Sequence, residues 1–346
     1  MLRPMTVGLT ALALACTPGA SRAQPAAGQE WGPPSPMRAM SEHRASLLAQ
    51  CPPAAPRLPE ADAAKLAIHV VEHGTAGPTV LVVHGGVQGG LGGGPSTFAG
   101  QEALGGQGWR LRIVERPGFG SSPSRGVDDM AADSVWIAAM LGDGANLVGY
   151  SWSGAEAPLA AARRPEAVRS LVLVEPALQQ LLMGSPAVDA DPVLKADAMR
   201  WGGLLMAART PGEYALKFAH SLGAVETGSD APRTAVAALD ADPALAARYG
   251  CALLQARMAS PEAMRQAAET VARAHIPVLV ITGGWSPFFD VVGETAARLT
   301  GGRHVVVRSS NHFVQLTNAA EFNTTVDAFM RGAGKTRLSP APEAIR

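Results

Sequence analysis

Short runs of apolar residues recur along most of the chain. They read LAIHVVE, TVLVVHGG, WRLRIVE, ANLVGY, SLVLVE, IPVLVITGG and RHVVV. Most are continuous rather than alternating, which is the pattern of strands that are buried on both faces. The segments between them, such as DMAADSVWIAAML and GAEAPLAAARRP, have helical composition. Strands that alternate with helices predict an α/β fold built on a doubly wound, mostly parallel sheet.

One long interval breaks this alternation. Residues 181–268 contain no strand-like run, and four segments have helical character: MRWGGLLMAAR, YALKFAHSL, PALAARYGCALLQARM and PEAMRQAAETVARA. We predict a helical cap over residues 181–268, inserted between two strands as a lid. We interpret its Met and Trp side chains as the core of the lid rather than as substrate contacts. The sheet domain then comprises residues 63–180 and 269–335, and residues 336–346 form a flexible tail.

The first residues have the character of a targeting segment. Arg3 precedes an apolar run over residues 7–15, and small residues at Ser21 and Ala23 fit a signal-peptidase site. The run is too short to span a bilayer, so residues 1–23 are predicted to be a cleaved export signal. The alternative is a lipoprotein signal, with a lipid anchor at Cys16. Both predict an exported protein, periplasmic or secreted, and no later apolar stretch is long enough for a membrane-spanning segment.

Residues 24–62 form an N-terminal extension rich in Pro, Ala and Gly. Only MRAMSEHRASLLAQ within it has helical spacing, and we expect the extension to pack loosely. Export also affects the cysteines, because an oxidising compartment permits a bridge between Cys51 and Cys251. A disulfide and two separate buried thiols both remain open.

Charge and glycine patterns exclude several functions. The 29 basic and 29 acidic residues balance, which gives no reason to expect nucleic acid or an anionic membrane surface as a partner. The glycine-rich stretch VHGGVQGGLGGGPSTF lacks the Lys-Ser or Lys-Thr of a phosphate-binding loop and does not match G-x-G-x-x-G. Zinc-protease signatures are absent, and two cysteines alone make no zinc site. We expect no metal and no cofactor.

Ser151 carries the strongest chemical signal. It follows the apolar run ANLVGY and precedes a helical segment, in the order Gly149-Tyr150-Ser151-Trp152-Ser153-Gly154. This is the strand-turn-helix context of a nucleophile elbow, G-x-S-x-G, with Ser153 in place of the second glycine. A plain helix N-cap is the alternative role for Ser151.

His312 and the His-Gly-Gly turn at 84–86 also follow predicted strands, and in open α/β sheets functional residues usually lie beyond the carboxyl ends of the strands. His312 follows the last apolar run, at the same sheet edge as Ser151, so we predict that it is a catalytic base. A His-Gly-Gly turn follows TVLVV, where backbone N–H groups can approach a developing oxyanion closely. The N–H groups of Gly86 and Trp152 are the predicted pair of donors.

Four motifs together carry a family resemblance. They are HGG at 84–86, ERPGFGSS at 115–122, GYSWSG at 149–154 and SNHFVQL at 310–316. Over roughly residues 65–332 the chain resembles the α/β-hydrolase superfamily, serine esterase-like with a helical cap domain, although Glu115 stands where that family usually has Asp. The resemblance implies a Ser nucleophile, a His base and an acidic residue that orients the His. A serine in the elbow argues against the dehalogenase and epoxide-hydrolase branches, which use a carboxylate.

The acidic residue that orients His312 is less obvious from the sequence. The family most often places it in a G-x-x-D turn after the strand IPVLVI, but here that register falls on Ser286 or Pro287. Ser-Pro is instead a strong helix start, which puts Asp290 about one turn into a helix. Glu175 ends the run that follows the elbow, and adjacent parallel strands lie only about 4.8 Å apart. We therefore predict Glu175 as the acid, with Asp290 as the alternative.

These residues define a functional expectation. It is an enzyme that cleaves a carboxylic ester, small or medium and largely apolar, through an acyl-enzyme on Ser151. The alternatives are a C–C bond hydrolase, a lactonase or a perhydrolase on the same site, or a non-catalytic binding protein of the same fold.

Overall fold

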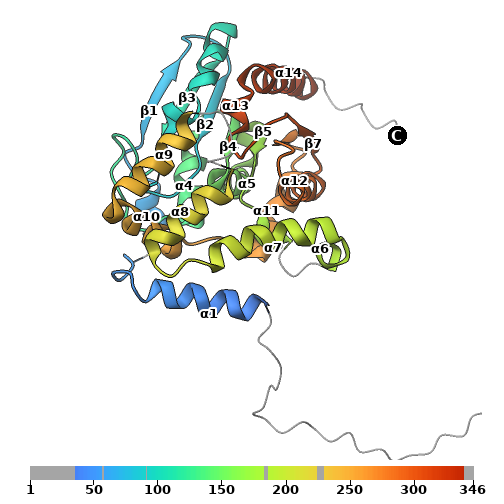
Figure 1. Ribbon diagram of the computed structural model, residues 1–346. Helices are drawn as coiled ribbons and strands as arrows, with labels where there is room; N and C mark the ends of the chain where they lie inside the picture. The colour runs from blue at the N-terminus through green and yellow to red at the C-terminus, as the bar shows by residue number, and fades with distance from the viewer. Residues whose placement is uncertain (1–35, 57, 91, 183–185, 224–229, 339–346) are drawn as a thin grey trace, which may run out of the picture.

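The computed structural model describes residues 36–56, 58–90, 92–182, 186–223 and 230–338 (Figure 1). The expected export signal, with Cys16, lies outside these residues, as do residues 339–346 of the expected tail. A seven-stranded sheet has the order β1-β3-β2-β4-β5-β6-β7, and only β1 runs antiparallel to its neighbour. The strands are β1 (His69–His73), β2 (Thr79–Val83), β3 (Arg110–Glu115), β4 (Ala145–Tyr150), β5 (Val168–Val174), β6 (Val278–Thr282) and β7 (Arg303–Val306). Each corresponds to one of the apolar runs, which confirms the predicted doubly wound sheet.

Helices cover both faces of this sheet, and alternate strand residues feed two cores. Leu81 and Val83 belong to one core, while Val80 and Val82 belong to the other. The first core is completed by four helices that pack on one another: α4 (Met130–Met140), α5 (Trp152–Arg163), α11 (Pro261–Arg273) and α12 (Pro287–Thr300). The second core is covered by the 3₁₀ helix η1 (Ala99–Gln107) and by α14 (Ala319–Leu338). Burial on both faces explains why the strands read as continuous apolar runs.

The winding of the sheet reverses beside β2. This strand lies between β3 and β4, so the chain passes from one side of β2 to the other after β3. In open α/β sheets, ligands bind outside the carboxyl ends of the strands at such a switch point. The His84–Gly86 turn and Ser151 both follow strands at this place.

In the described part of the segment between β5 and α11 there are five α-helices. They are α6 (Pro186–Ala190), α7 (Pro192–Met206), α8 (Pro211–Ser221), α9 (Asp230–Ala241) and α10 (Pro243–Gln255). Helices α6 and α9 were not predicted. The proline at position 232 of α9 reads as a turn signal, but it falls in the first helical turn, where a missing N–H costs no hydrogen bond. Helix α11, expected within the cap, packs against α5 and α12 instead.

The end of the N-terminal extension packs tightly, contrary to expectation. Helix α1 (Pro36–Leu48) contacts α10, and the Leu47 side chain is 1% exposed. A disulfide joins Cys51 to Cys251 of α10. The side chain of Arg257 also donates to the carbonyl of Ala55 (2.7 Å). The expectation of loose packing overlooked the apolar side of α1, which shares a small core with Leu254.

Candidate active site

Ser151 occupies a sharp turn between β4 and α5. Its backbone has φ 55° and ψ −114°, a strained conformation for a residue with a side chain. A Cβ on Gly149 would lie 2.4 Å from the Ser153 carbonyl oxygen, and one on Gly154 would lie 2.8 Å from Cα of Pro176. Close backbone approach is thus required at Gly149 and Gly154, which explains how the elbow accepts a side chain at Ser153.

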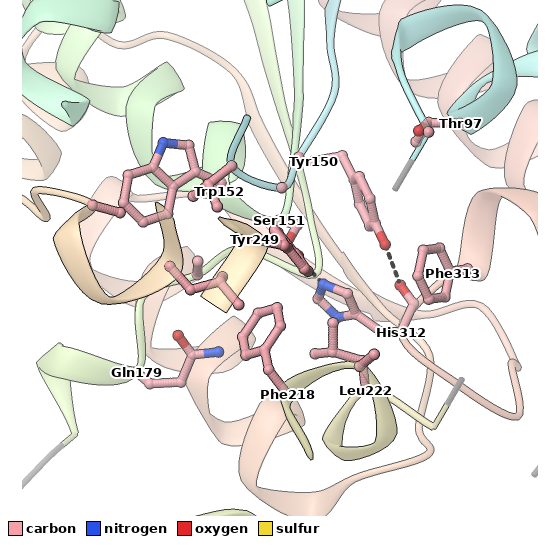
Figure 2. Close-up of a pocket in the computed structure, with 18 of the residues that line it drawn as sticks. Thr97, Tyr150, Ser151, Trp152, Gln179, Phe218, Leu222, Tyr249, His312 and Phe313 are labelled. Carbon is pink, nitrogen blue, oxygen red and sulfur yellow. Dashed lines mark hydrogen bonds between the residues drawn. The ribbon is translucent and has the colours of Figure 1, made fainter. Parts of the chain in front are cut away.

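The structure brings His312 to Ser151. Nε2 of His312 lies 2.8 Å from Oγ of Ser151, and the His312 side chain is buried (Figure 2). Rings of Tyr150 and Phe289 pack against the imidazole, with centroids 5.2 and 5.4 Å away. The Tyr150 hydroxyl donates to the His312 carbonyl (3.2 Å), and the His312 N–H donates to the carbonyl of Leu222 in the cap segment (3.2 Å). The backbone of His312 is therefore held by both the sheet and the cap, and the neighbouring aromatic rings pack against its imidazole.

Glu175 contacts the other side of the same imidazole. Its Oε2 lies 3.0 Å from Nδ1 of His312, and the carboxyl group is fully buried. The second oxygen, Oε1, accepts hydrogen bonds from the N–H of Gly283 (2.6 Å) and from Nε1 of Trp285 (3.2 Å). Glu175 also has a positive φ of 44°, like Ser151. Both carboxylate oxygens of Glu175 are thus engaged, Oε1 by donors in the loop after β6 and Oε2 by His312.

Asp290 takes a different role. Its Oδ1 accepts hydrogen bonds from Oγ1 of Thr282 and from the N–H of Gly284 (3.3 Å). It lies in the first turn of α12, and Ser286 caps that helix by accepting from the N–H of Phe289 (3.3 Å). Asp290 therefore ties down the loop that donates to Glu175, whereas the hydrogen bond to His312 comes from Glu175.

Two backbone N–H groups beside Ser151 are available to bind an oxyanion. Among the described residues, neither the N–H of Gly86 nor that of Trp152 has a hydrogen-bond acceptor. Gly86 has φ +77°, which favours glycine, and Gly85 packs so closely that an added Cβ would lie 2.5 Å from Cβ of Ser151. The loop after β2 and the start of α5 thus meet at Ser151, as expected for the two predicted donors.

A cavity of about 560 Å³ opens onto Ser151 and His312. Its wall is mostly apolar, and cap side chains form much of it, among them Leu205. Phe218 and Leu222 of the cap also line it (Figure 2). Trp201 and Met258 also line the cavity, whereas the sequence led us to assign the Met and Trp residues of the cap to its core. The amphipathic spacing of a cap helix does not reveal which apolar residues face an internal space.

A buried charged cluster beside the site was missed in the sequence. Arg116 donates to Asp128 (2.9 Å), Asp133 (2.9 Å) and Glu156 (3.1 Å), and its backbone N–H donates to Nε2 of His84 (3.0 Å). Burial and the nearby Arg116 charge lower the pKa of His84 to about 3, so this histidine is neutral. The only sequence signal was the position of Arg116 after a strand, in the ERPGFGSS turn.

The comparisons with known proteins agree with this architecture. Residues 78–319 match the family model described as "alpha/beta hydrolase fold". A curated relative from Neisseria meningitidis serogroup B (strain MC58) is named pimeloyl-[acyl-carrier protein] methyl ester esterase. It is 28% identical over 236 residues, which cover 65% of this chain and 83% of that protein.

Solved structures show the same fold. A thermophilic esterase from Thermogutta terrifontis has a TM-score of 0.54 at 18% identity, covering 77% of this chain and 94% of that one. A hydrolase from Pseudomonas aeruginosa has a TM-score of 0.53 at 18% identity, covering 76% and 94%. The family match spans more than half of the sequence, and the sheet order and elbow agree with it. The chain belongs to the α/β-hydrolase fold family.

Proposed function

We propose that this protein is a serine hydrolase that cleaves carboxylic esters through an acyl-enzyme on Ser151. The observation that carries the proposal is the continuous chain of hydrogen bonds from Ser151 Oγ through His312 to Glu175, at 2.8 and 3.0 Å. A nucleophile within hydrogen-bond reach of a base, which a third group orients, is the general signature of covalent catalysis by serine.

The first half of the reaction forms the acyl-enzyme. Nε2 of His312 takes the proton of Ser151 as Oγ attacks the ester carbonyl carbon. The carbonyl oxygen becomes an oxyanion that accepts hydrogen bonds from the N–H groups of Gly86 and Trp152. The tetrahedral intermediate then collapses, and the Nε2–H of His312 protonates the departing alkoxide. Glu175 keeps Nδ1 protonated and stabilises the imidazolium.

The second half regenerates the enzyme. A water molecule attacks the acyl carbon while His312 takes one of its protons, and the new tetrahedral intermediate uses the same two N–H donors. Its collapse breaks the bond to Oγ, releases the carboxylic acid and returns the proton to Ser151.

Support for the substrate class comes from the cavity and from the relatives. An apolar wall around about 560 Å³ suits an acyl or alkyl group of small to medium size. A relative named as a methyl ester esterase at 28% identity favours ester bonds over other scissile bonds. Export of the protein is also part of the proposal, and the Cys51–Cys251 disulfide supports it because disulfides persist in oxidising compartments.

The test is the hydrolysis of p-nitrophenyl esters of increasing acyl length by the wild type and by Ser151→Ala. We expect the variant to lose about 10⁵-fold or more in kcat, because the residues of such a triad act as a unit. Its melting temperature should stay close to that of the wild type, since the substitution removes only a hydroxyl and the fold is otherwise unchanged. Turnover by the variant close to that of the wild type would overturn the proposal. A parallel panel of lactones and β-diketones tests for other reactions at the same site.

A further inference from the structure

A cluster of buried polar residues adjoins the loop of residues 84–88, outside the chain of Ser151, His312 and Glu175. Each of its members is at most 3% exposed. Of its members, Arg116 follows β3, Asp128 precedes α4 and Asp133 lies within it, and Ser153 and Glu156 lie in α5. Burying several charged groups destabilises the folded state unless each group is paired and hydrogen-bonded.

The cluster holds the main chain of the loop on both sides of its N–H donor. The guanidinium of Arg116 donates to the carbonyl of Gly86. Asp128 accepts from the N–H of Gln88 (2.9 Å). His84 donates from Nδ1 to the carbonyl of Gly85 (2.8 Å) and accepts at Nε2 from the N–H of Arg116. The N–H of Gly86 is left without an acceptor among the described residues, and its neighbours are fixed.

Ser153 also contacts this loop, through the carbonyl of His84, and its hydroxyl has a second contact, with Glu156. Both contacts can be hydrogen bonds only if one further proton is present. Oγ of Ser153 lies 2.7 Å from the carbonyl oxygen of His84 and 2.7 Å from Oε2 of Glu156. A serine hydroxyl has one hydrogen to donate, and a carbonyl oxygen has none. If Ser153 donates to His84, the contact with Glu156 is a hydrogen bond only when the carboxyl group carries the proton.

The charges around Glu156 agree with a neutral carboxyl group. Arg116 faces it at 3.1 Å, and Asp133 also interacts with it. Arg125 pairs with Asp133 (2.8 Å), while Asp128 pairs with Arg116 (2.9 Å). The two arginines are thus balanced by two aspartates, which leaves Glu156 as a third acid. Burial raises the pKa of Glu156 well above its usual value. The Arg116 charge opposes this rise, the charge of Asp133 and a hydrogen bond with Asp133 add to it, and the hydrogen bond with Ser153 opposes it.

We propose that Ser153 and Glu156 are positioning residues for the oxyanion site: a neutral Glu156 carboxyl donates to Ser153, which donates to the His84 carbonyl and so fixes the loop that presents the Gly86 N–H. This inference rests on the proposed function, since it assigns the Gly86 N–H to the developing oxyanion. It also accounts for the serine at a position where the elbow pattern has glycine. The hydroxyl supplies a link that a glycine at this position lacks.

The kinetic test uses Ser153→Ala, Glu156→Ala and Glu156→Gln. We expect Ser153→Ala and Glu156→Ala each to lower kcat by about tenfold or more with KM within about twofold, because oxyanion contacts act in the transition state. The double alanine variant should be no worse than either single one, since the two residues form one chain. Glu156→Gln should keep kcat within about threefold, because its amide N–H can replace the carboxyl proton toward Ser153.

Ser170→Ala is the matched control. Ser170 is a fully buried serine with a 2.7 Å hydrogen bond to Asn146, at the far ends of the strands. The Ser170→Ala variant should be destabilised about as much as Ser153→Ala, but its kcat should equal that of the wild type. Equal kinetic effects of Ser153→Ala and Ser170→Ala would overturn the proposal, as would a Glu156→Gln variant as impaired as Glu156→Ala.

The proton itself has a readout that does not depend on catalysis. The infrared difference spectrum of the wild type minus Glu156→Gln at pH 7 should contain the C=O band of a protonated carboxyl group. A difference band from an ionised carboxylate would contradict the proposal. Activity in Ser151→Ala would refute the proposed function, but it would leave the infrared result unaffected, so the two failures are distinguishable. If Glu156→Gln does not fold, the same band is sought in the wild type minus Glu156→Leu.

Discussion

Glu175 reaches His312 from the strand next to the one that carries Ser151: Oε2 of Glu175 lies 3.0 Å from Nδ1 of His312. The two residues are 137 positions apart in the chain. The parallel pairing of β5 with β6 and of β6 with β7 brings the end of β5, before Glu175, and the end of β7, before His312, to one edge of the sheet. This relationship assigns the acid of the site to the end of β5 rather than to the loop after β6.

The acid assignment predicts unequal effects of two amide substitutions. Glu175→Gln keeps the shape of the side chain but stabilises the wrong imidazole tautomer, so we expect kcat to fall by about 10²–10⁴. Asp290→Asn removes the charge but keeps one oxygen that can still accept from the Gly284 N–H and from Thr282, so kcat should fall by about tenfold or less. Steady-state kinetics of both variants on one p-nitrophenyl ester provide the comparison. A larger loss in Asp290→Asn than in Glu175→Gln would reverse the assignment.

The disulfide predicts a contribution to stability. Cys51 and Cys251 are 200 residues apart, and their bond ties the end of α1 to the cap. The double variant Cys51→Ser/Cys251→Ser should lose about 2–4 kcal/mol in the free energy of unfolding, because the cross-link restricts the unfolded chain. Urea denaturation measures the loss. Reductant should shift the wild-type midpoint toward that of the variant and leave the variant unchanged; identical midpoints without reductant would show that the bridge is not formed.

The raised pKa of Glu156 predicts a pH dependence of stability. Between the pKa of the unfolded chain and the higher pKa of the folded state, the folded protein binds the extra proton, so stability falls as pH rises. The slope for one such group is at most about 1.4 kcal/mol per pH unit. Glu156→Gln removes this titration, so the variant should gain stability relative to the wild type from pH 5 to pH 8. Urea midpoints at both values measure the difference, and a constant difference would mean that Glu156 does not carry the proton.

Much of the site was predictable because strand ends are predictable. Apolar runs, most of them continuous, located the seven strands of the described sheet, and the residues after them included Ser151, Glu175 and His312. The Ser-Pro pair at Ser286 and Pro287 correctly predicted the start of α12. That local signal was enough to move the search for the acid from Asp290 to Glu175.

Contacts between distant segments were not predictable. Asp197 of α7 accepts hydrogen bonds from Ser286 and from the N–H of Phe288 (3.2 Å), which joins the cap to α12. Arg116 follows β3 and Glu156 lies in α5, and the packing of α4 against α5 brings Asp133 and Glu156 together around the Arg116 guanidinium. Whether a charged side chain is buried depends on residues that are distant in the sequence, and the local sequence pattern does not identify them.

The measurement that tests the central claim most directly is covalent labelling of the active serine. Wild-type protein treated with a fluorophosphonate should gain one adduct per chain, and peptide mass spectrometry should assign it to Ser151. Ser151→Ala should gain none, and His312→Ala should react far more slowly because Oγ loses its base. An adduct on another residue, or wild-type protein that stays unlabelled while it hydrolyses esters, would contradict a Ser151 acyl-enzyme.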